Sequence, residues 1–313
     1  MGSWKVLLTD GLESNGQEIL KKIAQVDDRP GISADELLTI IGDYDALIVR
    51  GRTKVTAAVF EAAGKLKVVG RAGIGVDNID LNAAKERNVI VVNSPLATTV
   101  TVAELTLALM LAAVRDLARA DRTMKEGKWL KKEFEGAELS GKTLGVIGMG
   151  RIGAAVVKRA SAFDMQVLGY DPLIPADEIK ARGAQPASLD ELLKKADMIT
   201  MHIPLTPDSK QILNADAFGK MKQGVYIICA ARGGVIEEEA LLDALNSGKV
   251  AGAALDVFAA EPPGLTELVG HPRVVCTPHI GAQTVEAQAR AAEDISSEIS
   301  RALQGETLRW RVA

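Results

Sequence analysis

Short runs of apolar, mostly β-branched residues recur along this chain and alternate with stretches of helical periodicity. In the first hundred residues, the runs lie at 5–9, 46–49, 67–69 and 89–92, and residues 13–23 have a helical pattern. Runs that are apolar throughout are typical of parallel strands covered by helices on both faces. Their alternation with helices predicts right-handed βαβ units and therefore a doubly wound α/β fold.

A second series of apolar runs begins near residue 140. These runs lie at residues 143–148, 166–170, 198–201, 225–229, 252–256 and 274–277. A chain of 313 residues is longer than one ordinary hydrophobic core supports. The two series therefore predict two α/β domains, each built on a doubly wound parallel sheet.

The stretch between the two series predicts a long helix at residues 102–117 that is apolar on nearly every face. Such a helix is normally buried, either within a subunit or between two subunits. In the charged stretch 122–135 that follows, Glu126, Glu133 and Glu135 interleave with the basic residues. This pattern favours a solvated face over a nucleic-acid site.

The overall balance of charge gives no attraction to polyanions. The net charge is −4, from 37 Lys and Arg against 41 Asp and Glu, so neither a nucleic-acid nor a membrane partner is expected. The sequence predicts no signal peptide and no membrane span, which favours a cytoplasmic protein. Cys229 and Cys276 lack the spacing of metal ligands, so free thiols and no metal are expected.

A glycine-rich motif follows the first strand of the second series. Gly148, Gly150 and Gly153 fit the pattern Gly-x-Gly-x-x-Gly, and a helical run opens directly after it. Gly148 permits a tight turn, Gly150 leaves room for a pyrophosphate, and Gly153 lets the helix pack closely on the strand. The free N–H groups of the helix N-terminus would then bind the phosphates, which predicts a dinucleotide cofactor.

An acidic residue at the end of the next strand indicates which dinucleotide binds. Asp171 lies 23 residues after Gly148 and can accept hydrogen bonds from both hydroxyls of a ribose. A carboxylate at that position repels a 2′-phosphate, so NAD is predicted rather than NADP. The alternative is a turn-forming residue before Pro172.

Three polar residues lie just after other strands of the second series. They are Arg232, Glu261 and His279. Ligands of open α/β sheets bind at the carboxyl ends of the strands, where these residues fall. Taken singly, each has a structural alternative: a surface ion pair for Arg232, a solvated loop carboxylate for Glu261 and a structural histidine for His279.

Seven stretches together give this chain a resemblance to a known family. They are residues 49–55, 70–78, 124–129, 141–145, 231–234, 252–258 and 279–282. In these stretches and over essentially its whole length, the chain resembles the D-isomer-specific 2-hydroxyacid dehydrogenases. It departs from longer members, which carry a C-terminal regulatory part, and in residues 96–100, where related enzymes often have a loop rich in Gly and Asn.

The resemblance implies a catalytic role for each of the three polar residues. His279 would take the proton of the C2 hydroxyl during oxidation and return it during reduction. Glu261 would orient the imidazole and favour its protonated form. Arg232 would bind the substrate carboxylate with its planar fork and polarise the carbonyl oxygen.

The resemblance also implies residues that bind NAD and the substrate. Asp256 would hold the nicotinamide amide. The rest of the NAD site would be formed by Arg151, Ile152, Ile203, Ala230, Ala231, Gly281 and Ala282. Gly73 and Ile74 would offer backbone N–H groups to the substrate carboxylate. A basic cluster of Arg50, Arg52, Lys54 and Arg71 favours a phosphorylated substrate, and its alternative is a solvated charged turn.

The resemblance also implies a domain architecture and a reaction. Residues 1–96 and 284–313 would form a flavodoxin-like substrate domain, residues 97–283 a Rossmann NAD-binding domain, and the cleft between them the active site of a homodimer. The expected reaction is oxidation of 3-phosphoglycerate to 3-phosphohydroxypyruvate, the first step of serine biosynthesis. The alternatives are a reductase of glyoxylate, hydroxypyruvate or another 2-keto acid and, more remotely, a regulator resembling the C-terminal-binding-protein corepressors.

Overall fold

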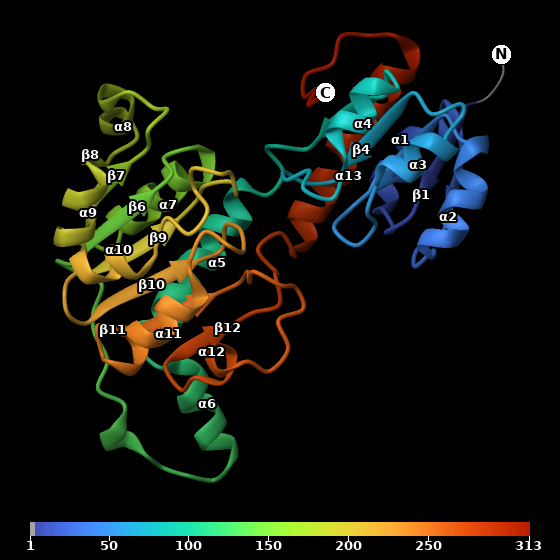
Figure 1. Cartoon of the computed structure of the whole chain (residues 1–313). Coiled ribbons are helices and arrows are strands. Elements are labelled where there is room, and N and C mark those ends of the chain that lie inside the picture. Colours follow the sequence, from blue (N-terminus) through green and yellow to red (C-terminus); the bar gives the residue numbers. More distant parts are fainter. Residues whose placement is uncertain (1–3) are drawn as a thin grey trace. The chain divides into compact units, whose positions relative to one another are not determined.

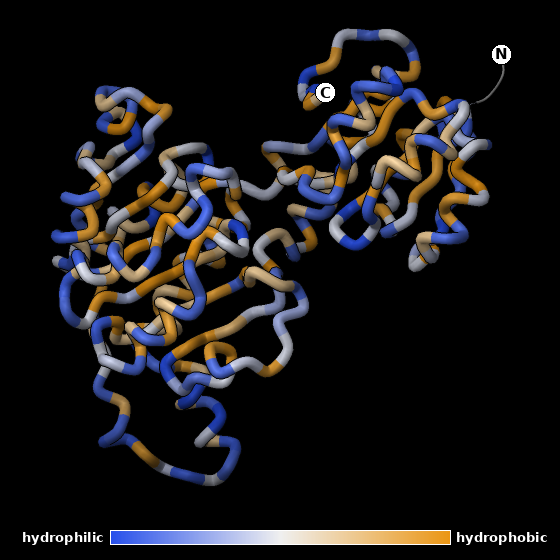
Figure 2. The backbone as a smooth tube through the Cα atoms, viewed as in Figure 1, coloured by the Kyte–Doolittle hydropathy of each residue, from blue (hydrophilic) through white to orange (hydrophobic). Residues whose placement is uncertain are grey.

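The computed structural model describes residues 4–313, which divide into two compact units. The first unit comprises the described residues up to Thr98 together with Ala282–Ala313, and the second is Thr99–Gly281. These limits lie within two residues of those implied by the resemblance. Each unit is an α/β sandwich around one parallel sheet, and its central strands are among the most apolar segments of the chain (Figures 1 and 2).

The described part of the first unit has a five-stranded parallel sheet in the order β2-β1-β3-β4-β5. The strands are β1 (Trp4–Leu8), β2 (Ala24–Asp28), β3 (Ala46–Val49), β4 (Val68–Arg71) and β5 (Ile90–Asn93). The helices are α1 (Ser14–Lys21), α2 (Ala34–Ile40), α3 (Ala57–Ala62), α4 (Leu81–Glu86) and α13 (Val285–Gln304), with a 3₁₀ turn at Ile41–Asp43. This strand order is that of flavodoxin-like folds.

Alternate residues of each strand in this sheet pack into two separate cores. Val6 and Leu8 face α1 and α13, whereas Leu7 faces the side of α2, α3 and α4. Because successive side chains of a strand point to opposite faces, a strand covered on both faces must be apolar throughout. The apolar runs that predicted β1, β3, β4 and β5 have this cause.

The edge strand β2 was not predicted from the sequence. Its residues are Ala-Gln-Val-Asp-Asp, and it pairs only with β1. A strand at the edge of a sheet has fewer neighbours and tolerates polar side chains, which also discourage pairing with other chains. Strand β2 therefore lacks the apolar signature of the central strands.

The second unit, Thr99–Gly281, is described in full and has a seven-stranded parallel sheet in the order β12-β11-β10-β9-β6-β7-β8. The strands are β6 (Thr143–Ile147), β7 (Gln166–Tyr170), β8 (Gln185–Pro186), β9 (Met198–Met201), β10 (Val225–Cys229), β11 (Val250–Leu255) and β12 (Val274–Cys276). The order matches the Rossmann arrangement, with one strand added after the sixth. The predicted fold class is confirmed.

Helices cover both faces of this second sheet. Their bounds are α5 (Thr99–Val114), α6 (Leu117–Lys125), α7 (Arg151–Ser161), α8 (Ala176–Ala181), α9 (Leu189–Lys195), α10 (Ala215–Lys220), α11 (Glu238–Asn246) and α12 (Glu267–Gly270), with a 3₁₀ turn at Lys131–Glu133. Helices α5 and α7 share one core, and α9, α10 and α11 share the other. No helix within residues 4–313 is long and apolar enough to cross a membrane.

The long apolar helix begins at Thr99, three residues before its predicted start, and differs from the prediction in two further ways. It ends at Val114, because Asp116 adopts a left-handed conformation (φ +50°) and separates α5 from α6. Residues Val102, Leu107 and Met110 are buried, whereas Ala108 is exposed and Leu111 half-buried. Helix α5 is thus buried on one side only within its unit. Helix α6 and the loop after it extend away from the body of the unit (Figure 1).

Candidate active site

The candidate site begins at one edge of the second sheet, where six strands end in register. Ile147 pairs with Tyr170 and Met201, Cys229 pairs with Met201 and Leu255, and Leu255 pairs with Cys276. The residues that follow these ends are Gly148, Asp171, His202, Ala230, Asp256 and Thr277. Parallel strands thereby bring segments from across more than a hundred residues to the edge where α/β proteins bind ligands.

The glycine-rich loop has the shape that a dinucleotide requires. Gly148 has φ +93°, and a Cβ there would lie 2.5 Å from the carbonyl oxygen of His202. A Cβ on Gly153 would lie 2.1 Å from the carbonyl oxygen of Gly148, whereas one on Gly150 would meet no described atom within 4 Å. Gly148 and Gly153 thus permit close packing, and Gly150 leaves open space before Arg151 and Ile152 begin helix α7. The residues fit the pyrophosphate of NAD.

The carboxylate of Asp171 is fixed by the backbone on both of its oxygens. Oδ2 accepts a hydrogen bond from the N–H of Met149 (2.8 Å), and Oδ1 accepts one from the N–H of Leu173 (2.9 Å). Each carboxylate oxygen has a second acceptor position, which suits the two hydroxyls of a ribose. An open pocket of about 360 Å³ adjoins Asp171, with Ile174, Ile179 and Pro186 among its apolar walls.

His202 is a half-buried histidine beside this loop, with a buried Nδ1, that the sequence analysis did not single out. Burial lowers the pKa of its imidazole to about 4, so the ring is neutral at physiological pH. Its Nε2 lies 3.2 Å from the hydroxyl of Thr200, and Nδ1 has no hydrogen-bond partner within residues 4–313. The residue supplies the carbonyl that packs on Gly148, next to Ile203. A histidine directly after a strand was the signal in the sequence.

His279 and Glu261 form a direct pair in the second unit. His279 Nδ1 lies 2.7 Å from Glu261 Oε2, and Glu261 Oε1 accepts a hydrogen bond from the N–H of Phe258 (3.1 Å). The carboxylate is therefore oriented by its own loop while it orients the imidazole. Both side chains remain about a third to a half exposed, so the other edge of the imidazole is accessible.

The carboxylate of Asp256 holds the loop that carries His279. Asp256 is 1% exposed and accepts three hydrogen bonds from described residues: from the Thr277 hydroxyl (2.5 Å), the Ile280 N–H (2.8 Å) and the Gly281 N–H (2.8 Å). His279 has φ +52°, a conformation that is costly for a residue with a Cβ. Successive N–H groups around a buried anion stabilise such a turn. Oδ2, which takes only the Gly281 bond, keeps an acceptor position for a nicotinamide amide.

Arg232 follows strand β10 in a turn that packs against the loop of Glu261. A Cβ on the neighbouring Gly233 would lie 1.7 Å from the carbonyl oxygen of Phe258, so only glycine allows this approach. Arg232 Nη1 donates to the carbonyl of Ala231 (2.7 Å), and Ala230 and Ala231 are buried. In Cys229, at the end of β10, burial raises the pKa of the thiol to about 11, so it stays protonated.

The first unit carries the predicted carboxylate-binding loop after β4. A Cβ on Gly73 (φ +146°) would overlap Nη1 of Arg71. The Gly73 N–H donates to the carbonyl of Arg71 (2.8 Å), so it does not point outward as expected. The Gly73 carbonyl accepts from the N–H of Ser94 (2.9 Å), and in a trans peptide the Ile74 N–H points the opposite way. Ile74 therefore remains as a donor for an anion.

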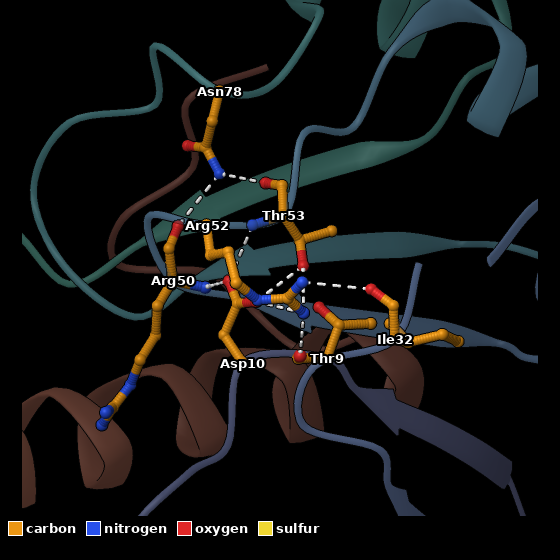
Figure 3. Close-up of polar contacts among 7 residues, drawn as sticks. All are labelled: Thr9, Asp10, Ile32, Arg50, Arg52, Thr53 and Asn78. Carbon is orange, nitrogen blue, oxygen red and sulfur yellow. Dashed lines mark hydrogen bonds and ion pairs between the residues drawn. The ribbon is translucent and has the colours of Figure 1, made fainter. Parts of the chain in front are cut away.

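The basic cluster after β3 divides into residues with different contacts (Figure 3). Arg52 donates to the carbonyls of Thr9 (2.7 Å) and Ile32 (3.1 Å) and pairs with Asp10 (3.2 Å). These contacts brace the turn, which Asn78 also holds by donating to the carbonyls of Arg50 and Thr53.

The two other basic residues of this turn have fewer contacts. The guanidinium of Arg50 points away from the Asp10 carboxylate (Figure 3) and contacts Glu13, while its buried Nε has no hydrogen-bond partner within residues 4–313. The side chain of Lys54 is exposed. Of the predicted site, the first unit thus contains Arg50, Arg52, Lys54, Arg71, Gly73, Ile74 and Ala282, and the second unit contains the rest.

Comparisons with known proteins agree with the predicted family and with the fold of this chain. Residues 107–281 match the NAD binding domain of the D-isomer specific 2-hydroxyacid dehydrogenases. The D-3-phosphoglycerate dehydrogenase of Methanocaldococcus jannaschii is 49% identical over 303 residues, which are 96% of this chain and 58% of that protein. The human D-3-phosphoglycerate dehydrogenase is 45% identical over 305 residues, which are 97% of this chain and 57% of that protein. A crystal structure of a glyoxylate reductase from Paecilomyes thermophila has a TM-score of 0.91 at 31% identity, covering 100% of this chain and 99% of that one.

The chain therefore belongs to the D-isomer specific 2-hydroxyacid dehydrogenase family, as its motifs predicted, and its second unit is an NAD-binding domain. It spans little more than half the length of these two phosphoglycerate dehydrogenases.

Proposed function

We propose that this chain oxidises D-3-phosphoglycerate to 3-phosphohydroxypyruvate with NAD. The observation that carries the proposal is the His279–Glu261 pair, 2.7 Å apart at the strand ends that also hold the glycine-rich loop. The 49% identity to a D-3-phosphoglycerate dehydrogenase supports this substrate. The test is turnover of purified protein on a panel of 2-hydroxy acids with and without phosphate. A preference for unphosphorylated acids would contradict the proposal.

The pair supports a role for His279 in proton transfer. With the Nδ1–H donated to Glu261, the lone pair of His279 Nε2 is free to accept the proton of the C2 hydroxyl. The ionised Glu261 then stabilises the imidazolium that forms, and Arg232 would hold the substrate carboxylate through two parallel hydrogen bonds. The glycine-rich loop and Asp171 would hold NAD, which would supply the acceptor for the hydride of C2. The proton returns from His279 to the substrate in the reverse reaction.

The second candidate is a reductase of glyoxylate, hydroxypyruvate or another unphosphorylated 2-keto acid. The glyoxylate reductase that shares this fold at 31% identity favours it. The same three catalytic residues would serve both reactions, so the phosphate site separates the two candidates. A corepressor-like NAD sensor is the more remote alternative, and turnover of any substrate in the panel counts against it.

We also propose a cytoplasmic location.

We propose Arg50 rather than Arg52 as the phosphate ligand, because Arg52 is already bonded to two backbone carbonyls and to Asp10, whereas the guanidinium of Arg50 is paired, among the described residues, with Glu13 alone. We expect Arg50→Ala to weaken use of 3-phosphoglycerate by about 1.5–3 kcal/mol, the scale of a charged hydrogen bond, and to spare unphosphorylated substrates. Steady-state kinetics on both classes of substrate measures the difference. Arg87→Ala, an exposed arginine of the same unit, is the control. An equal loss on glyoxylate would remove the phosphate assignment and favour the second candidate.

The fixed carboxylate of Asp171 predicts the choice of cofactor. We expect NAD to be preferred over NADP by at least about tenfold, because a carboxylate facing a 2′-phosphate costs more than about 1.4 kcal/mol. Asp171→Ala should narrow this ratio by removing the repulsion. Kinetics with each cofactor at saturating substrate gives the ratio. Equal activity of the unmodified protein with NADP would refute the assignment.

We also propose that two copies of this chain form a homodimer through helices α5 and α6. Leu117, Met124 and Trp129 are 51%, 54% and 77% exposed, and α5 leaves one apolar side uncovered by its own unit. Exposed apolar surface of this kind is buried by a two-fold interface. Light scattering should give twice the 33.1 kDa of the chain at micromolar concentration. A monomer under these conditions would contradict the proposal.

A further inference from the structure

The loop that carries Glu261 leaves the protein core at a defined point. Val257 and Phe258 are 4% and 6% exposed, whereas residues 259–262 are exposed. At this exit the backbone N–H of Ala259 donates to Glu238 Oε1 at 2.6 Å. The side chain of Glu238 is thus attached to the loop where packing against the core ends.

Glu238 contacts the loop from a helix that packs against the core of the second unit. It lies in the first turn of α11, whose residues Ala240, Leu241, Ala244 and Leu245 are buried in the core of the second unit. The turn of Arg232 immediately precedes this helix, and Gly233 of that turn contacts Phe258. Glu238 also lines a small cavity, with a volume near 10 Å³, together with Arg232 and Val257. The helix, the Arg232 turn and the Glu261 loop therefore meet at Glu238.

We propose that Glu238 is a positioning residue for the His279–Glu261 pair. The hydrogen bonds form a short series: Ala259 N–H donates to Glu238, Phe258 N–H donates to Glu261 Oε1, and Glu261 Oε2 accepts from His279 Nδ1. The bond to Glu238 fixes the residue after Phe258, and Phe258 in turn orients Glu261. The inference rests on the proposed function, in which His279 moves the proton, but it assigns Glu238 no contact with substrate or NAD.

The series predicts which property changes when Glu238 is lost. The loop keeps its buried start at Val257 but loses its restraint at Ala259, so Glu261 and the imidazole it holds sample other orientations. A misplacement of about 1 Å at a reacting group can cost up to about 100-fold in rate. The glycine-rich loop and Asp171 follow β6 and β7, which are separate from the Glu261 loop. The affinity for NAD should therefore stay within about twofold.

Three variants separate positioning from general loss of structure. Glu238→Ala should lower kcat about 10- to 100-fold, whereas Glu238→Gln, whose side-chain oxygen can still accept from Ala259, should retain activity within about threefold. Glu239→Ala removes the same charge from an exposed residue of the same helical turn and should match the unmodified protein. The dissociation constant for NAD and the melting temperature are measured for each variant.

A second readout does not depend on turnover. The chain has three histidines, so the imidazole nitrogens of His279 can be assigned in ¹⁵N NMR spectra by comparison with His279→Ala. The Nδ1–H signal of His279 should broaden or shift in Glu238→Ala and persist in Glu238→Gln. If Glu238→Ala behaves as Glu239→Ala in both kcat and the NMR signal, the inference is wrong. If the unmodified protein oxidises no 2-hydroxy acid while the NMR prediction holds, the proposed function fails and the positioning role stands.

Discussion

Replacing His279 with alanine should lower the rate of hydroxy-acid oxidation by about 10²–10⁴, the range typical for loss of a general acid–base. The variant lacks the acceptor for the C2 hydroxyl proton, and Glu261 loses its partner. The residues proposed to bind NAD, the glycine-rich loop and Asp171, are bonded to other parts of the second unit, so the affinity for NAD should be retained. Stopped-flow detection of NADH and calorimetric titration with NAD measure the two properties.

A matched control for this variant is His271→Ala. His271 lies in the same unit, and its Nδ1 accepts a hydrogen bond from the N–H of Arg273. Its replacement should leave the rate within about twofold of the unmodified protein, in line with other changes away from the reacting atoms. Near-normal activity of His279→Ala would remove the whole catalytic assignment and favour the NAD-sensor alternative.

Replacing Arg232 with lysine should raise KM for the hydroxy acid and also slow turnover, with kcat/KM falling by about 10²-fold. Lysine keeps the charge but lacks the planar fork, so it can neither bind a carboxylate through two parallel bonds nor polarise the carbonyl oxygen from the same position. The shape of the turn should survive, because Gly233 rather than Arg232 makes the close approach to Phe258. Steady-state kinetics over a range of hydroxy-acid concentrations separates the two effects.

The control for the Arg232 variant is Arg159→Lys, on helix α7 of the same unit. Arg159 pairs with Glu104 at 3.0 Å on the surface, and lysine can keep this ion pair. The control should therefore match the unmodified protein. An Arg232→Lys variant with unchanged KM would show that the guanidinium does not bind the substrate carboxylate.

Much of the fold could be predicted because the central strands are covered on both faces. Leu7 and Leu8 face different cores, so the strand that contains them is apolar throughout and easily recognised. The edge strand β2 has no such requirement. The break between α5 and α6 depends on the backbone of Asp116, and the residues on both sides keep a helical pattern. A backbone conformation at a single residue does not change the pattern of apolar residues from which helices are predicted.

The position of the candidate catalytic residues could be predicted because parallel strands end together. Arg232, Glu261 and His279 each follow a strand, and the register of β10, β11 and β12 brings those ends side by side. Contacts between side chains and remote backbone could not be predicted in this way. The bond from Arg52 to the Ile32 carbonyl and the bond from Ala259 to Glu238 join segments about 20 residues apart, and no local pattern specifies them.

The most direct test of the proposed reaction follows the hydrogen on C2. The purified protein is incubated with NAD and D-3-phosphoglycerate deuterated at C2, and the reduced cofactor and the 3-phosphohydroxypyruvate, trapped as a hydrazone, are analysed by mass spectrometry. Transfer of the hydride from C2 predicts one deuterium in the reduced cofactor for each molecule of product. His279→Ala should form both at a rate lower by about 10²–10⁴. Absence of reduced cofactor, or reduced cofactor without deuterium, would contradict the account.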